Sequence, residues 1–177
     1  MERHFYFFRH GQTNENKAGK REGTGIDAWL TKLGIIQAQQ LSEFLKNKKI
    51  QVIYSSPYKR AIDTAEIVLK NYHNVDIITA ESLKEAVFGF WYDENEIGKN
   101  TINDNFNRIK KYLEHIVESD NRKNIAIASH GGVTRALCFA CGHKVYGIQN
   151  CECFHFILNK DSWKYIESFK PQLDTNK

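Results

Sequence analysis

Two histidine motifs, far apart in the chain, contain the residues best suited to chemistry. Arg9-His10-Gly11 follows an apolar run over 5–8, and Ser129-His130-Gly131-Gly132 follows another over 125–128. A histidine that is neutral and oriented can attack phosphorus, and a neighbouring arginine can offer paired donors to phosphate oxygens. Glycine allows a sharp turn or a close approach to a ligand because it has no Cβ. Together the two motifs predict one phosphate pocket.

Both motifs lie at the ends of predicted strands. Residues 4–9 and 125–129 are apolar runs of strand length, and the stretch from Val133 onward is typical of a helix. The carboxyl edge of an open α/β sheet binds ligands, and the N–H groups at a helix start bind anions. A histidine satisfied within the core is the alternative interpretation of His130, and it is weakened because the same arrangement occurs twice.

Strand and helix patterns alternate along the rest of the chain. Thr31 is a predicted N-cap for a helix to about residue 47, and Ser56-Pro57 is a predicted helix start with proline at the first position. The alternation predicts an α/β fold, a three-layer α/β/α sandwich with a mostly parallel central sheet and one antiparallel strand near the C-terminus. Strands are also expected at 52–54, 75–78, 153–158 and 163–169, an amphipathic helix at 106–117, and functional loops at 11–29 and 89–103.

The composition is that of an ordinary globular protein. Of 177 residues, 41% are hydrophobic and 26% are charged, so a single domain over residues 1–177 is expected. The net charge of +4 is mild and lysines are interspersed with acids, so no nucleic-acid partner is expected. No signal peptide and no apolar run of about 18 residues is visible, which predicts a cytoplasmic protein with no membrane partner. A monomer and a homodimer both stay open.

The four cysteines form two pairs, Cys138 with Cys141 and Cys151 with Cys153. With a nearby histidine, either pair could belong to a zinc site. The first pair lies in an apolar helical stretch and the second in a predicted strand, where cysteines usually pack as small core residues. Disulfides are rare in the cytoplasm. We therefore expect inert thiols.

Taken in order, the motifs resemble those of the histidine phosphatase superfamily, also called the phosphoglycerate mutase-like family. The resemblance covers nearly the whole chain, and four motifs in the family's order make it specific. The residues that establish it are Arg9-His10-Gly11-Gln12-Thr13 with Asn16; Arg21, Gly23 and Asp27; Leu30-Thr31 with Gly34; Ser55-Ser56-Pro57 with Arg60-Ala61 and Thr64-Ala65; Leu83-Lys84-Glu85 with Phe88-Gly89 and Trp91; and Ser129-His130-Gly131-Gly132.

The resemblance implies a role for each pocket residue. His10 attacks the phosphoryl group and forms a phosphohistidine that water hydrolyses, which divides one difficult displacement into two. Arg9, Arg60 and His130 hold the nonbridging oxygens, over which the transition-state charge spreads. Glu85 protonates the leaving oxygen and later activates water. The implied catalytic residues are His10, Glu85, His130, Arg9 and Arg60, and the implied substrate-binding residues are Arg9, Gly11, Asn16, Arg21, Arg60 and Gly131.

Without the resemblance, several of these residues have ordinary interpretations. Arg60 and Arg21 could be solvated side chains, and Glu85 could belong to a common ion pair. The chain also departs from the family pattern: Tyr92-Asp93 stands where Glu-Gly is usual, and Cys151-Glu152 where a small residue and serine are common. The loop contacts at these two places therefore stay open.

The leading hypothesis is a metal-independent phosphomonoesterase that acts on a small phosphorylated metabolite and needs no cofactor. The segment between Glu85 and His130 is much shorter than in mutases, whose insertion covers the substrate. A short, open lid admits water, so hydrolysis is favoured over phosphoryl transfer between hydroxyls. The alternatives are a phosphoglycerate mutase, an α-ribazole-5′-phosphate phosphatase, and a non-catalytic regulator that binds phosphorylated ligands.

Overall fold

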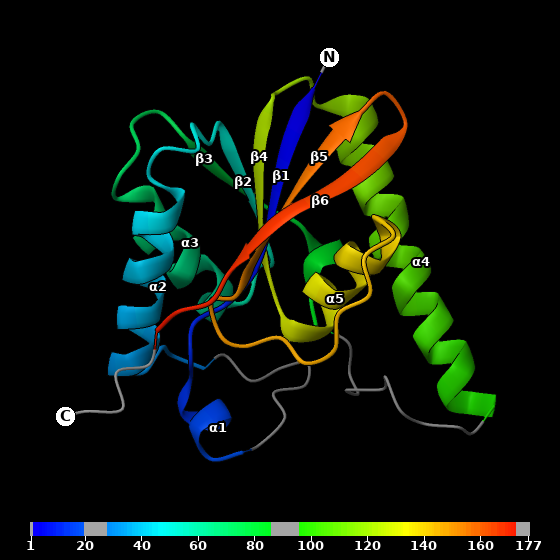
Figure 1. Cartoon of the computed structure of the whole chain (residues 1–177). Coiled ribbons are helices and arrows are strands. Elements are labelled where there is room, and N and C mark those ends of the chain that lie inside the picture. Colours follow the sequence, from blue (N-terminus) through cyan, green and yellow to red (C-terminus); the bar gives the residue numbers. More distant parts are fainter. Residues whose placement is uncertain (1, 20–27, 86–95, 173–177) are drawn as a thin grey trace.

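The computed structural model describes residues 2–19, 28–85 and 96–172, and for 96–103 it describes the backbone alone. Strands and helices alternate along it, as the sequence predicts (Figure 1). The strands are β1 (Arg3–Arg9), β2 (Val52–Ser55), β3 (Asp76–Thr79), β4 (Asn124–Ser129), β5 (Cys153–Asn159) and β6 (Ser162–Phe169). The helices are α1 (Asn14–Lys17), α2 (Lys32–Leu45), α3 (Lys59–Leu69), α4 (Glu96–Ser119) and α5 (Gly131–Ala140), with the 3₁₀ turn η1 (Glu81–Leu83).

The strands form a mixed sheet in the order β3-β2-β4-β1-β5-β6. Strands β1 to β4 run parallel, whereas β5 pairs antiparallel with both β1 and β6. The predicted sheet, mostly parallel with an antiparallel strand near the C-terminus, is confirmed. Because β2, β4 and β1 are parallel neighbours, their carboxyl ends meet at one edge of the sheet.

Helices cover both faces of the sheet and complete the predicted three-layer sandwich. Helices α2 and α3 pack on one face, and α4 and α5 on the other (Figure 1). This explains the continuous apolar run in β1, because Phe5 and Phe7 enter one core while Tyr6 and Phe8 enter the other. In the part of the chain that the structure describes, no helix is long and apolar enough to cross a membrane.

The four cysteines are core residues. All are buried and free, and Cys138 packs in the core beneath α4 and α5, whereas Cys151 and Cys153 pack in the other. Burial raises the pKa of every one of these thiols. A buried thiol with a raised pKa is a poor nucleophile and a poor metal ligand, which supports the expectation that they are inert.

The start of α3 differs from the predicted one. The helix begins at Lys59 with Tyr58 as N-cap, so the predicted start at Ser56-Pro57 is wrong. Ser56 instead extends the pairing of β2 with β4, because its N–H donates to the Ala128 carbonyl at 3.0 Å. Its hydroxyl accepts from the N–H of Tyr58 at 3.3 Å, which forms a turn before the helix.

Two helices lie within predicted loops. α4 begins at Glu96, so the expected loop over 89–103 is wrong from that residue onward. Once a helix is nucleated, each added residue gains a hydrogen bond at little cost, so the amphipathic part can extend through residues without a clear pattern. In the loop over 11–29, the short helix α1 is held by a capping box between Thr13 and Asn16.

The loop after β1 packs directly on the start of α2. A Cβ on Gly11 would lie 2.6 Å from the Gly34 carbonyl oxygen, and a Cβ on Gly34 would overlap the carbonyl of Gln12. The same carbonyl accepts a hydrogen bond from the N–H of Thr31 at 2.8 Å. Backbone meets backbone here, so neither glycine has room for a side chain.

This close approach predicts the effect of Gly34→Ala. In an ordinary helix the change stabilises by about 1 kcal/mol. Here the new methyl overlaps the Gln12 carbonyl, and overpacking of this kind typically costs about 1–3 kcal/mol. We expect urea denaturation to show a lower free energy of unfolding for Gly34→Ala and little change for Gln39→Ala, an exposed position of the same helix. A stabilised Gly34→Ala variant would contradict the packing described.

Candidate active site

The two predicted histidines meet at the carboxyl edge of the sheet. His10 follows β1, His130 follows β4, and the two ring centroids lie 5.3 Å apart with an interplanar angle of 63°. Both side chains are almost fully buried. Ser56, which follows β2, lies at the same edge and bonds to His130. The parallel pairing of three neighbouring strands therefore brings these side chains to one edge, and the sequence predicted this meeting for His10 and His130.

The His10 ring is oriented by its own loop. Its Nδ1 lies 2.8 Å from the Gly11 carbonyl oxygen. A carbonyl only accepts hydrogen bonds, so Nδ1 bears the proton and Nε2 keeps its lone pair. Burial, and then the charges of Arg9 and Arg60, hold the pKa of His10 well below its ordinary value of 6.5. The ring is thus neutral, oriented and nucleophilic at Nε2.

The His130 ring is fixed by Ser56. Its Nε2 lies 2.8 Å from the Ser56 hydroxyl, and in the described ranges its buried Nδ1 meets no hydrogen-bond partner. Burial, followed by the charges of His10 and Arg60, lowers the pKa of His130 well below 6.5. The sequence motif Ser-Ser-Pro contains Ser56, but only its position at a strand end indicated that it could reach the pocket.

The two predicted arginines flank the histidines. Arg60, in the first turn of α3, is fully buried, and its carbonyl accepts from the Thr64 hydroxyl at 2.7 Å. That hydroxyl also accepts from the N–H of Gly11 at 3.0 Å, which ties α3 to the His10 loop. Arg9 donates from Nη1 to the Ile148 carbonyl at 2.7 Å. Two permanent positive charges therefore stand beside two neutral imidazoles.

The loop that contains Asn150 and Cys151 packs against the end of β1, and sequence reasoning did not assign it to the site. Asn150 donates from its amide to the His10 carbonyl at 3.1 Å and to Oδ1 of Asn16 at 2.9 Å. The N–H of Cys151 donates to the Arg9 carbonyl at 3.1 Å. The predicted residue Asn16 is thereby placed next to the His10 loop. In the sequence, this loop was marked only by its departure from the family pattern after Asn150.

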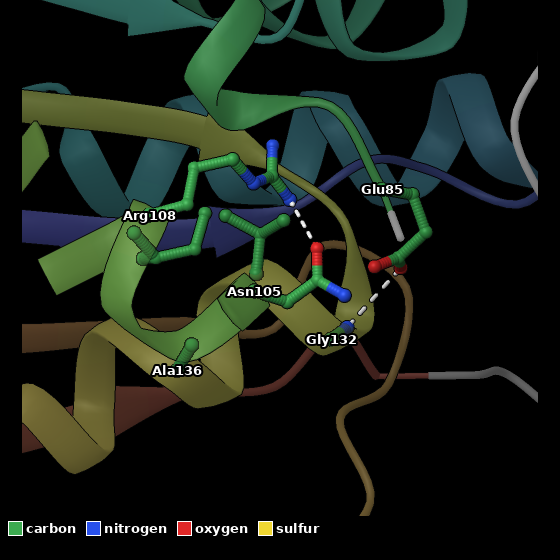
Figure 2. A pocket seen from close by; sticks show the side chains of 7 residues that line it. Glu85, Asn105, Arg108, Gly132 and Ala136 are labelled. Atoms are coloured by element: carbon green, nitrogen blue, oxygen red, sulfur yellow. Dashed lines mark hydrogen bonds between the residues drawn. The ribbon is translucent and has the colours of Figure 1, made fainter. Parts of the chain in front are cut away.

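Glu85 lies on the other side of His130, at the start of α5. Its Oε2 accepts a hydrogen bond from the N–H of Gly132 at 3.2 Å, as Figure 2 shows. Gly131 begins this helix directly after His130, and a Cβ on Gly131 would lie in ordinary contact with Arg9 at 3.7 Å. Carboxylates are favoured at helix N-termini by the exposed N–H groups. The structure thus brings His10, His130, Arg9, Arg60, Asn16, Gly11, Gly131 and Glu85 together.

Some predicted positions lie outside the described residues. These include Arg21, the second predicted anion contact, and Tyr92-Asp93, one of the departures from the family pattern. Within the described ranges, no group of three or more His, Cys, Asp or Glu side chains is arranged to hold a metal ion. The remaining motif residues outside the description are Gly23, Asp27, Phe88-Gly89 and Trp91.

Comparisons with known proteins agree with this fold. Residues 5–100 match the model of the histidine phosphatase superfamily, branch 1, and the chain belongs to this superfamily. It is a histidine-phosphatase-type enzyme.

Two relatives are similar in sequence. The chain is 31% identical over 175 residues to "Putative phosphoserine phosphatase 2" of Hydrogenobacter thermophilus, with 85% of this chain and 83% of that protein covered. It is 29% identical over 154 residues to "Metal-independent phosphoserine phosphatase" of Arabidopsis thaliana, with 73% of this chain and 64% of that protein covered.

The fold is similar to that of a solved structure with low sequence identity. The crystal structure of phosphoglycerate mutase from Bacillus anthracis superposes with a TM-score of 0.80 at 20% identity, and the match covers 93% of this chain and 92% of that one. The expected fold class is therefore confirmed.

The buried neutral histidines predict how stability depends on pH. The pKa of His10 is about 6.5 in the unfolded chain and lower in the folded one, so below pH 6.5 the unfolded chain binds more protons. Stability is thus fully present above pH 6.5 and is lost as the pH falls, by up to about 1.4 kcal/mol per pH unit for each such histidine.

We expect His10→Asn, which removes one such group, to reduce this pH dependence. Urea denaturation between pH 7.5 and pH 5.5 would measure it, with His115→Asn, an exposed position on α4, as the matched control. An unchanged slope in His10→Asn would show that the pKa of His10 is the same in the folded and the unfolded chain, and it would contradict the lowered pKa of the buried ring.

Proposed function

We propose that the protein is a metal-independent phosphomonoesterase that hydrolyses a small phosphorylated metabolite through a phosphohistidine at His10. The observation that most strongly supports this is the His10 ring, whose Nδ1 donates to the Gly11 carbonyl while Arg9 and Arg60 stand beside it. A neutral imidazole whose Nε2 is unprotonated, next to two cations, is suited to attack on a phosphate ester.

The proposed reaction has two displacements. In the first, Nε2 of His10 attacks phosphorus, the N–P bond forms, the P–O bond to the alcohol breaks, and Glu85 gives its proton to the leaving oxygen. In the second, water attacks phosphorus, Glu85 takes a proton from the water, and the N–P bond breaks. Inorganic phosphate leaves, and His10 and Glu85 return to their starting states.

Positive charge at the phosphate comes from protein groups in this proposal. Arg9 and Arg60 provide charge-assisted hydrogen bonds, and the N–H of Gly131 at the start of α5 adds a backbone donor. His130 bears a buried Nδ1 beside the His10 ring and donates to a nonbridging oxygen when that nitrogen is protonated. The name of the Arabidopsis relative includes metal independence, which supports the same assignment here.

The substrate class is a small phosphate monoester. Two relatives are named phosphoserine phosphatases, so phosphoserine is the first compound to test. Phosphoglycerates follow because of the fold shared with a phosphoglycerate mutase.

A chelation experiment tests the overall proposal. We expect purified protein to release inorganic phosphate from para-nitrophenyl phosphate at the same rate with and without a strong chelator. Vanadate, which mimics five-coordinate phosphorus, should inhibit because transition-state analogues bind far more tightly than substrates. Loss of activity with chelator and recovery with a divalent metal would overturn metal independence. In a coupled assay, isomerisation of a phosphoglycerate with little phosphate release would favour the mutase alternative.

Substitutions separate the two histidines by role. His10→Ala should abolish both turnover and the acid-labile phosphoprotein, because it removes the attacking atom. His130→Ala should slow turnover by about 100- to 1000-fold, the usual loss for one stabilising donor, while some phosphoprotein still forms at His10. Rapid quenching in base, in which phosphohistidine is stable, measures both quantities with labelled substrate, and His115→Ala is the control. Phosphate trapped on His130 and none on His10 would reverse the assignment.

A further inference from the structure

Arg108, on the inner side of α4, is bound to the turn that precedes Glu85. Its Nη1 donates to the Ser82 carbonyl at 3.0 Å and reaches the Glu81 carbonyl at 3.4 Å. Its Nη2 donates to the Lys84 carbonyl at 3.0 Å and to Oδ1 of Asn105 at 3.2 Å. One planar guanidinium thus contacts three carbonyls of the segment that ends at the proposed acid, those of Glu81, Ser82 and Lys84.

Two of these carbonyls need a donor from outside the turn. The Glu81 carbonyl begins the 3₁₀ turn η1 and accepts from the N–H of Lys84 at 3.1 Å. The carbonyls of Ser82, late in the turn, and of Lys84, just after it, have no such partner inside the turn. Leu83 fixes the turn from the other side, because its side chain is fully buried in the core below α4 and α5. The buried Leu83 side chain and the Arg108 guanidinium therefore hold the backbone immediately before Glu85 in place.

The contacts determine where the Glu85 carboxylate can reach. Glu85, Asn105, Arg108 and Gly132 line one small recess, in which the guanidinium and the carboxylate lie on either side of Asn105 (Figure 2). At the far end, Oε2 of Glu85 meets the N–H of Gly132. The carboxylate is held between α4 and the helix that begins after His130.

The charge of Arg108 also reaches both proposed catalytic groups. Burial lowers the pKa of Arg108, and the neighbouring Glu85 raises it in opposition. The same guanidinium is among the charges that lower the pKa of His130. Arg108 is therefore coupled to the acid through its charge as well as through the backbone.

We propose that Arg108 is a positioning residue, which sets the place of Glu85 for protonation of the leaving oxygen by holding the carbonyls of Ser82 and Lys84. This rests on the proposed function, in which Glu85 is the acid. Because general acid catalysis depends on placement, a displacement of about 1 Å can cost about a hundredfold in rate. We expect this loss of rate in the first displacement, in which the leaving oxygen takes the proton from Glu85.

The test compares two substrates that need the acid to different degrees. Glycerol phosphate has a poor leaving group and depends on protonation, whereas para-nitrophenyl phosphate has a good one and does not. For Arg108→Gln we expect kcat for glycerol phosphate to fall about 10- to 100-fold with KM nearly unchanged, and kcat for the aryl ester to fall less than about threefold. Lys110→Gln, at an exposed position of the same helix, is the matched control and should leave both rates unchanged.

Glu85→Gln completes the experiment. It should show the same selectivity for leaving group more strongly, and Arg108→Gln added to it should cause little further loss, because the acid is then already absent. A wild type that hydrolyses neither ester, or a Glu85→Gln variant without selectivity, would overturn the proposed function and the positioning role with it. If Glu85→Gln is selective and Arg108→Gln slows both esters equally, or raises KM alone, only the positioning role is overturned.

Arg108→Lys covers the case in which Arg108→Gln does not fold. Lysine keeps the charge and most of the stem, but it cannot span several carbonyls with a planar fork. We expect a smaller fall in kcat, again selective for glycerol phosphate. A circular dichroism spectrum equal to that of the wild type would show that the variant is folded. Full activity of Arg108→Lys on both esters would overturn the proposal that the fork geometry places Glu85.

Discussion

Four cation-capable side chains share one pocket, three of them buried, and this is the constraint on which the rest of the site depends. His10, His130 and Arg60 are almost completely removed from solvent, and Arg9 stands beside them. Arginine stays protonated in proteins, so desolvation and repulsion both act on the imidazoles and hold them neutral. A neutral imidazole keeps a lone pair. The repulsion that prevents protonation thus also makes His10 available as a nucleophile.

Such a pocket must be oriented by groups that do not add a competing anion. The structure uses backbone carbonyls for this purpose: Gly11 for the His10 ring, and Ile148 for Arg9. Asn150 in turn binds the His10 carbonyl, and Thr64 connects the Gly11 N–H with α3. Each bond fixes a direction without adding formal negative charge. The close contact between the Gly11 loop and α2 holds this backbone in place.

The sequence predicted the parts of the site that depend on strand ends. Apolar runs before His10 and His130 identified two parallel strands, and parallel strands place their ends at one edge. The prediction from sequence was wrong where a local pattern competes with a tertiary contact. Pro57 suggested a helix start, but pairing of Ser56 with β4 delays the helix to Lys59. Arg108 carried no signal, because a lone arginine on an amphipathic helix is usually solvated, and its carbonyl partners are distant in sequence.

The proposed acid and the phosphate pocket are held by different parts of the fold. His10 and Arg60 depend on β1 and α3, whereas Glu85 depends on η1 and α4 through Arg108. The start of α5 contacts both, since it follows His130 and its second N–H binds the Glu85 carboxylate. In the proposed reaction the phosphate, common to all substrates, would meet the part held by β1 and α3, and the leaving group would meet the part built by η1 and α4. Changes in η1 or α4 could therefore alter the leaving group that is accepted while the nucleophile and its arginines stay in place.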